Sequence, residues 1–228
     1  MVSAADRRER REGGLSTRAV LFDFGGVLGL PQDPQRLAAM AEMAGQPVPR
    51  FREAYRRRRL ELDRGTLSSE EYWSEILLEC GTRPSAETLA RLEREDTLSW
   101  TRVNERVLRW AEELRRAGLR TAILSNMPTA KVGYLRSDGR FSWILSFDPV
   151  VFSCEPRIVK PEPEIYHLCL ERLGISPQEC LFLDDTPENL KGAAAVGIPG
   201  YHFSTAERAA ADLGGRGLPV ESLAQGRS

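Results

Sequence analysis

The chain has 228 residues, of which 41% are hydrophobic, enough for one large α/β domain or for a core with a smaller companion. Its 32 basic and 33 acidic residues give a formal net charge of −1, so we expect no nucleic-acid partner and no membrane-surface partner. No apolar run is long enough to span a bilayer. Four scattered cysteines without a C-x-x-C pair argue against a zinc site and indicate reduced thiols in a cytoplasmic protein.

Residues 1–17 alternate arginine with acidic residues and contain no apolar stretch, so we expect a mobile lead-in rather than a signal peptide. The run Ala19–Phe22 then predicts a short strand buried on both faces. The strand ends at Asp23, and the following Gly25 and Gly26 allow the backbone to turn sharply and approach a bound group.

Residues 31–99 show helical periodicity and no alternation typical of strands. Helices are expected over 35–44, around 51–62, and after Ser68 and Ser85, which are good N-terminal caps. We expect Tyr72 and Trp73 to pack inside this region and residues 56–59, four consecutive arginines, to form an exposed helical face. The pattern predicts a separate helical subdomain inserted after the first strand.

From residue 103 onward, predicted helices and strands alternate. Strands are expected near 121–124, 150–153, 180–183 and 198–203, with helices near 103–114, 128–136, 162–173, 187–196 and 206–213. Such alternation is typical of parallel strands joined by right-handed crossovers. Cys169 and Cys180 fall within apolar patterns and are expected in the core.

Polar residues end three of the predicted strands, and a lysine lies in a loop before a helix: Asp23, Ser125-Asn126, Asp184-Asp185 and Lys160. The carboxyl ends of parallel strands meet at one edge of a sheet, where ligands bind. A carboxylate can attack phosphorus, hydroxyl and lysine groups can hold phosphate oxygens, and further carboxylates can hold Mg²⁺. The set therefore favours phosphoryl transfer. Two adjacent acids after a buried strand repel each other unless a cation or helix N-terminus helps them.

Lysine is rare in this chain, since only three of its 32 basic residues are lysines. Lys160 lies between a strand and Pro161, so we single it out. Lys131 and Lys191 are expected to be solvated helix residues.

With these motifs in order, the chain resembles the haloacid dehalogenase superfamily of hydrolases, in the subgroup with a helical cap after the first strand. The resemblance covers residues 18–213. It implies a Rossmann-like parallel α/β core made of residues 18–30 and 100–222, with residues 31–99 as the cap. A cap of this kind would close over a substrate and exclude water.

The resemblance also implies roles in phosphate binding. Asp23 would be the nucleophile that forms an aspartyl-phosphate. Ser125, the backbone of Asn126 and the Gly26 turn would bind the phosphoryl group, and Lys160 would pair with both Asp23 and the phosphoryl oxygens.

A Mg²⁺ site is implied by the same resemblance. Asp23, the backbone carbonyl of Gly25 and Asp185 would be direct ligands, and Asp184 would act through a neighbouring ligand or through a water molecule. Asn189 would support this loop.

One position departs from the family's phosphatases, which usually carry a second Asp, a proton donor, where this chain has Gly25. Three interpretations stay open: a phosphatase whose substrate needs less leaving-group protonation, a metal-independent 2-haloacid dehalogenase, or a low-turnover phosphometabolite-binding module. We favour a Mg²⁺-dependent phosphatase of a small phosphorylated metabolite, such as a sugar phosphate, working as a monomer or homodimer.

Overall fold

The computed structural model describes residues 17–225, so the predicted lead-in lies, apart from Thr17, outside the described residues. Five parallel strands form one sheet in the order β3-β2-β1-β4-β5. Their bounds are β1 (Ala19–Phe22), β2 (Arg120–Ser125), β3 (Val150–Phe152), β4 (Cys180–Asp184) and β5 (Gly200–His202). The α/β fold class expected from the alternating pattern is thus confirmed, with β1 in the centre of the sheet.

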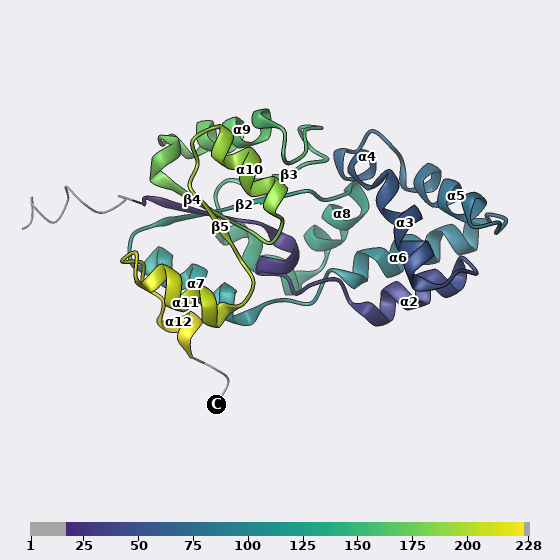
Figure 1. Cartoon of the computed structure of the whole chain (residues 1–228), viewed down its shortest axis with the longest axis horizontal. Coiled ribbons are helices and arrows are strands. Elements are labelled where there is room, and N and C mark those ends of the chain that lie inside the picture. The colour runs from purple at the N-terminus through teal and green to yellow at the C-terminus, as the bar shows by residue number, and fades with distance from the viewer. Residues whose placement is uncertain (1–16, 226–228) are drawn as a thin grey trace, which may run out of the picture.

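Helices cover both faces of this sheet (Figure 1). On one face lie α7 (Glu105–Arg116), α11 (Ala206–Gly214) and α12 (Glu221–Ala224). The opposite face is covered by α9 (Pro163–Leu173) and α10 (Pro187–Ala195), while α8 (Thr129–Ser137) follows β2. Connecting turns of 3-10 type occupy Gly139–Ser146 and Pro177–Glu179.

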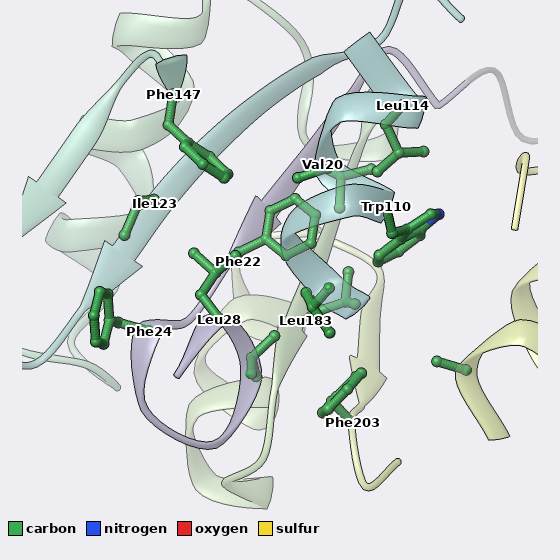
Figure 2. Packing of buried hydrophobic residues seen from close by; sticks show 14 of the residues in the cluster. Val20, Phe22, Phe24, Leu28, Trp110, Leu114, Ile123, Phe147, Leu183 and Phe203 are labelled. Carbon is green, nitrogen blue, oxygen red and sulfur yellow. The ribbon is translucent and has the colours of Figure 1, made fainter. Parts of the chain in front are cut away.

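The two faces of β1 pack into two different cores. Val20 and Phe22 point toward α7 and α11, whereas Ala19 and Leu21 pack against α9 and α10. Figure 2 shows Phe22 at the centre of the first core, where its ring meets the Trp110 indole edge-on with 5.5 Å between centroids. Burying such a side chain contributes roughly 1.5–3 kcal/mol. A strand apolar on both faces is therefore what holds the sheet between its two helix layers.

The remaining helices form a group of their own, which we call the helical unit. It comprises α2 (Pro34–Met43), α3 (Val48–Arg57), α4 (Arg59–Arg64), α5 (Ser69–Glu79) and α6 (Ala86–Ser99). These helices share a separate apolar core in which Tyr72 and Trp73 are buried, as predicted. The unit lies beside the sheet domain in Figure 1.

Two antiparallel linkers join the helical unit to the sheet domain. Gly29 and Val103 form an isolated antiparallel bridge, and the Leu30 backbone N–H donates to the Arg102 carbonyl over 2.7 Å. A second connection joins the end of α4 to the loop before α9, where the Arg64 guanidinium forms an ion pair with Glu162. The helical unit is therefore held to the sheet domain at the two linkers and at this ion pair.

Element boundaries differ from the sequence prediction in a few places. The expected helix around 51–62 is interrupted at Arg58, whose φ of −119° separates α3 from α4. The last strand is shorter than expected, three residues long, and the short helix α12 was not predicted. None of the helices within residues 17–225 is both long and apolar enough to cross a membrane.

Candidate active site

The strand register brings the predicted acids to one edge of the sheet. Phe22 of β1 is aligned with Leu183 of β4, and the Asp23 N–H donates to the Leu183 carbonyl over 2.9 Å. Asp23 therefore lies next to Asp184. Carboxylate oxygens of Asp23, Asp184 and Asp185 all lie within 4.8 Å of one another.

Lys160 lies between two of these acids although its side chain is only 1% exposed. Its Nζ is 2.9 Å from Asp23 Oδ1 and 2.6 Å from Asp184 Oδ2. Burial lowers the pKa of Lys160, but the two carboxylates outweigh this effect and hold it above its usual value. The lysine is therefore a fixed positive charge at the floor of the site.

The loop that carries Lys160 is held by Asn126 at the end of β2. The Asn126 side-chain amide donates to the Lys160 carbonyl over 2.9 Å and accepts from the Lys160 N–H over 2.8 Å. This pair of hydrogen bonds positions the lysine. Ser125, one residue earlier, is buried, and its hydroxyl makes no hydrogen bond within residues 17–225.

Asp184 and Asp185 have different environments. Asp184 is fully buried, and Asn189 Nδ2 donates to both of its oxygens at 3.0 Å, while the Thr186 N–H donates to Oδ1. Tyr166 in turn donates to the Asn189 carbonyl over 2.7 Å. Asp185 is exposed instead, so it is the acid of this pair that is available to a ligand.

The turn after β1 lets Asp185 approach closely. Gly26 has a φ of +73°, and a Cβ placed there would lie 2.2 Å from Asp185 Oδ2. Only glycine fits both the backbone conformation and this contact. We expected this turn to approach a bound group, and what the structure shows is its close approach to Asp185.

Negative charge exceeds positive charge at this edge. Desolvation raises the pKa of Asp23 to about 7 in spite of Lys160, and Asp184 adds to the rise. Desolvation and Asp184 also raise the pKa of Asp185. Clustered carboxylate oxygens, which outnumber the one lysine beside them, are a donor set that suits a hard divalent cation such as Mg²⁺.

Asp23 offers one anchored and one free oxygen. Its Oδ1 accepts from the Phe24 N–H over 2.6 Å and forms an ion pair with Lys160. Its Oδ2 has no hydrogen-bond partner among the described residues. The arrangement leaves one carboxylate oxygen oriented and available.

These groups open into a cavity of about 790 Å³ between the sheet edge and the helical unit. Asp23, Gly25, Ser125 and Lys160 line the sheet side. A Cβ at Gly25 would lie 3.3 Å from the Trp100 ring, so this indole covers the position where the family's phosphatases usually carry a second Asp.

Two predictions about basic residues were wrong. Lys131 is not solvated: it is 5% exposed and lines the cavity. Arg59 is not on an open helical face, because its guanidinium binds Asp63 and Asp96 inside the helical unit. Lys131 lies four residues before the buried Leu135 on α8, and this spacing, with the rarity of lysine, was the signal available in the sequence. Lys191, by contrast, is exposed as expected.

The sequence of this chain matches the family model of the haloacid dehalogenase-like hydrolases over residues 17–197. Mouse acyl-CoA dehydrogenase family member 10 is 32% identical over 219 residues, covering 90% of this chain and 20% of that protein. The sesquiterpene phosphatase AstK of Aspergillus oryzae is 27% identical over 63% of this chain and 71% of its own. This chain spans about a fifth to a third of the first curated relatives it matches.

Solved structures show the same fold. A HAD family enzyme from Bacteroides thetaiotaomicron, in complex with magnesium and inorganic phosphate, has a TM-score of 0.66 at 24% identity, covering 81% of this chain and 93% of its own. L-2-haloacid dehalogenase from Xanthobacter autotrophicus has a TM-score of 0.62 at 24% identity, covering 86% and 83%.

Proposed function

Because this chain belongs to the haloacid dehalogenase-like hydrolases, we propose that it is a Mg²⁺-dependent phosphatase acting on a small phosphorylated metabolite. The observation that carries this proposal is the meeting of Asp23, Lys160 and Asp185 in one cavity. These residues come from three distant segments, and each is of the type that phosphoryl transfer requires.

Asp23 acts as the nucleophile in this proposal. Its free oxygen attacks phosphorus and forms an aspartyl-phosphate as the bond to the leaving oxygen breaks, and the leaving oxygen takes up a proton. Water then hydrolyses the acyl phosphate, which releases inorganic phosphate and restores Asp23. Lys160 stabilises the charge on the phosphoryl oxygens throughout, and the Ser125 hydroxyl, free of other partners, donates to one of them.

Asp23, the Gly25 carbonyl and Asp185 would hold the Mg²⁺ ion, and Asp184 would support them from its hydrogen-bonded position. The ion would neutralise charge on the phosphoryl group and on the clustered acids. Asn189 keeps the Asp184 carboxylate oriented toward Lys160.

The acidic pair favours a phosphatase over a dehalogenase. Dehalogenases of this superfamily displace halide without a metal ion, so they have no need for an exposed acid beside the nucleophile. Here Asp185 is exposed within 4.8 Å of the Asp23 and Asp184 oxygens. The four cysteines are free thiols, which suits the cytoplasmic location that we propose.

Replacing the nucleophile tests this function. We expect Asp23→Asn to reduce Mg²⁺-dependent hydrolysis of p-nitrophenyl phosphate by a factor on the order of 10³ or more, because an amide cannot attack phosphorus. The matched control is Asp148→Asn, whose side chain is 88% exposed and lies beside Arg120 at the start of β2, at the opposite edge of the sheet from the site. Wild-type turnover in Asp23→Asn would disprove the nucleophile assignment. Release of chloride from 2-chloropropionate without metal would select the dehalogenase instead.

A further inference from the structure

The cavity contains a second buried lysine that the proposed reaction does not use. Lys131 begins the buried face of α8, and its Nζ lies over two aromatic rings, 4.9 Å from the Phe24 centroid and 5.3 Å from the Trp100 centroid. It forms no ion pair and donates no hydrogen bond to any residue from 17 to 225. A buried ammonium with no directly bound acceptor is costly, and an anionic group that enters the cavity would supply one.

The nearby carboxylates of the protein are already engaged elsewhere. Arg59 Nε is 2.9 Å from Asp63 Oδ1, and Arg59 Nη1 binds both oxygens of Asp96 at 2.9 and 3.0 Å. Tyr55 donates a further hydrogen bond to Asp96 over 2.5 Å. Neither acid forms an ion pair with Lys131, although two carboxylates beside one guanidinium leave a negative charge that offsets part of the ammonium's charge from a distance.

The same wall holds another donor without an acceptor. The Trp100 indole N–H is buried and has no hydrogen-bond partner among residues 17–225. Trp100 also covers Gly25, which places this corner beside the nucleophile turn. Lys131 lines the cavity here, and its ammonium, held over two ring faces without a hydrogen-bond acceptor among the described residues, makes this corner suited to an anion.

We propose that Lys131 binds a carboxylate on the alcohol part of the substrate, so that the enzyme prefers phosphate monoesters bearing a carboxylate near the ester. This inference rests on the proposed function. In an in-line displacement the leaving group points away from the attacking Asp23 oxygen, into the cavity that Lys131 lines. A single ammonium balances one negative charge, which suits a carboxylate better than a second phosphate dianion.

Two further arginines line the outer part of this cavity. Arg52 and Arg56 lie one turn apart on α3, and both are exposed. Exposed guanidinium groups are screened by solvent and discriminate less than a buried ammonium. These two arginines are the other cations that would favour a substrate with a carboxylate, so the test must separate their effect from that of Lys131.

The test compares two substrates that differ only in the group of interest: 2-phosphoglycerate carries a carboxylate where glycerol 2-phosphate carries a hydroxymethyl group. For wild type we expect kcat/KM to favour 2-phosphoglycerate. In Lys131→Met this preference should fall about tenfold or more, because a charged hydrogen bond in a buried site is lost. Lys131→Arg, which keeps the charge, should retain part of the preference.

The matched control is Lys191→Met on α10, which removes an exposed lysine and should leave the preference unchanged. Circular dichroism and thermal melting of each variant establish that it is folded. A preference that survives Lys131→Met, or that disappears only in Arg56→Met, would overturn the inference.

Binding separates this inference from the proposed function. If wild type hydrolyses neither compound, the phosphatase proposal fails for them, but calorimetric dissociation constants of the same two compounds still decide the role of Lys131. Tighter binding of 2-phosphoglycerate that is lost in Lys131→Met would support it. Equal binding of both compounds by wild type would refute it.

Discussion

At the scale of single residues, Lys131 shows a conflict between stability and function. Desolvation lowers the pKa of Lys131 to about 8, and Arg59 contributes to the shift, while Asp96, Asp63 and Asp23 oppose it. The charged form is therefore destabilised in the folded protein. A methionine would pack against the same rings without this cost, so it is the inferred carboxylate ligand that gives the buried charge a role.

This conflict predicts a pH-dependent gain in stability for Lys131→Met. The folded pKa of about 8 lies below the usual 10.5, so between these values the unfolded wild type binds more protons and its stability rises with pH. The variant lacks this titration. Its advantage should be full below about pH 8, by at most about 3 kcal/mol, and shrink toward pH 10.5.

Urea unfolding of wild type, Lys131→Met and the control Lys191→Met at pH 7 and pH 10 checks this expectation. An advantage of Lys131→Met that did not change between the two pH values would show that the ammonium is not destabilised by burial.

At the scale of elements, the turn after β1 connects the strand to the site. Gly26 has a left-handed conformation there and leaves space for Asp185 at the end of β4. Two requirements coincide at this one residue: the positive φ and the close approach. Some other glycines within residues 17–225 meet only the first. Gly118, between α7 and β2, has a φ of +88° and no atom within 4 Å of a Cβ built there.

Substituting Gly26 and Gly118 separates the requirement for a positive φ from the requirement for space beside Asp185. Both Gly26→Ala and Gly118→Ala should lose about 1 kcal/mol of stability through the positive φ. Gly26→Ala should lose roughly a further 1–3 kcal/mol, because its methyl group displaces the Asp185 carboxylate. Hydrolysis of p-nitrophenyl phosphate should fall only in Gly26→Ala. Equal unfolding energies and equal activities of the two variants would contradict the proposed contact.

At the scale of the whole molecule, the site is assembled from segments far apart in the sequence. Asp23 follows β1, Lys160 precedes α9, and Asp185 follows β4, with the helical unit forming the opposite wall of the cavity. A cation shared by the ends of β1 and β4 would bind only the folded chain. Binding of that kind stabilises a protein by mass action.

We therefore expect Mg²⁺ to raise the Tm of wild type. At one hundred times the dissociation constant the gain is about 2.7 kcal/mol, which corresponds to several degrees for a chain of this size. Asp185→Asn should weaken or abolish this shift, whereas the exposed control Asp148→Asn should keep it. Differential scanning calorimetry with EDTA or Mg²⁺ measures it. An equal shift in Asp185→Asn would remove this acid from the ligand set.

Much of the fold was determined by the sequence alone, because its signals are local. The apolar run Ala19–Phe22 fits a strand buried on both faces, and it forms the central strand. Alternation of strands and helices from residue 103 predicts parallel strands. The carboxyl ends of such strands share an edge, so the proximity of Asp23, Asp184 and Asp185 was also predictable. Cys169 and Cys180 are buried as their patterns predicted.

Only the tertiary structure decided which polar side chains are buried and with what partners. Lys131 and Arg59 read as exposed in a linear sequence, since their burial depends on how α8, α4 and α6 pack together. The close approach of Gly26 to Asp185, and of Gly25 to Trp100, likewise requires segments that are distant in sequence. Local patterns specify helices and strands, whereas desolvation, charge pairing and cavity shape depend on three-dimensional neighbours, and these determine what the cavity can bind.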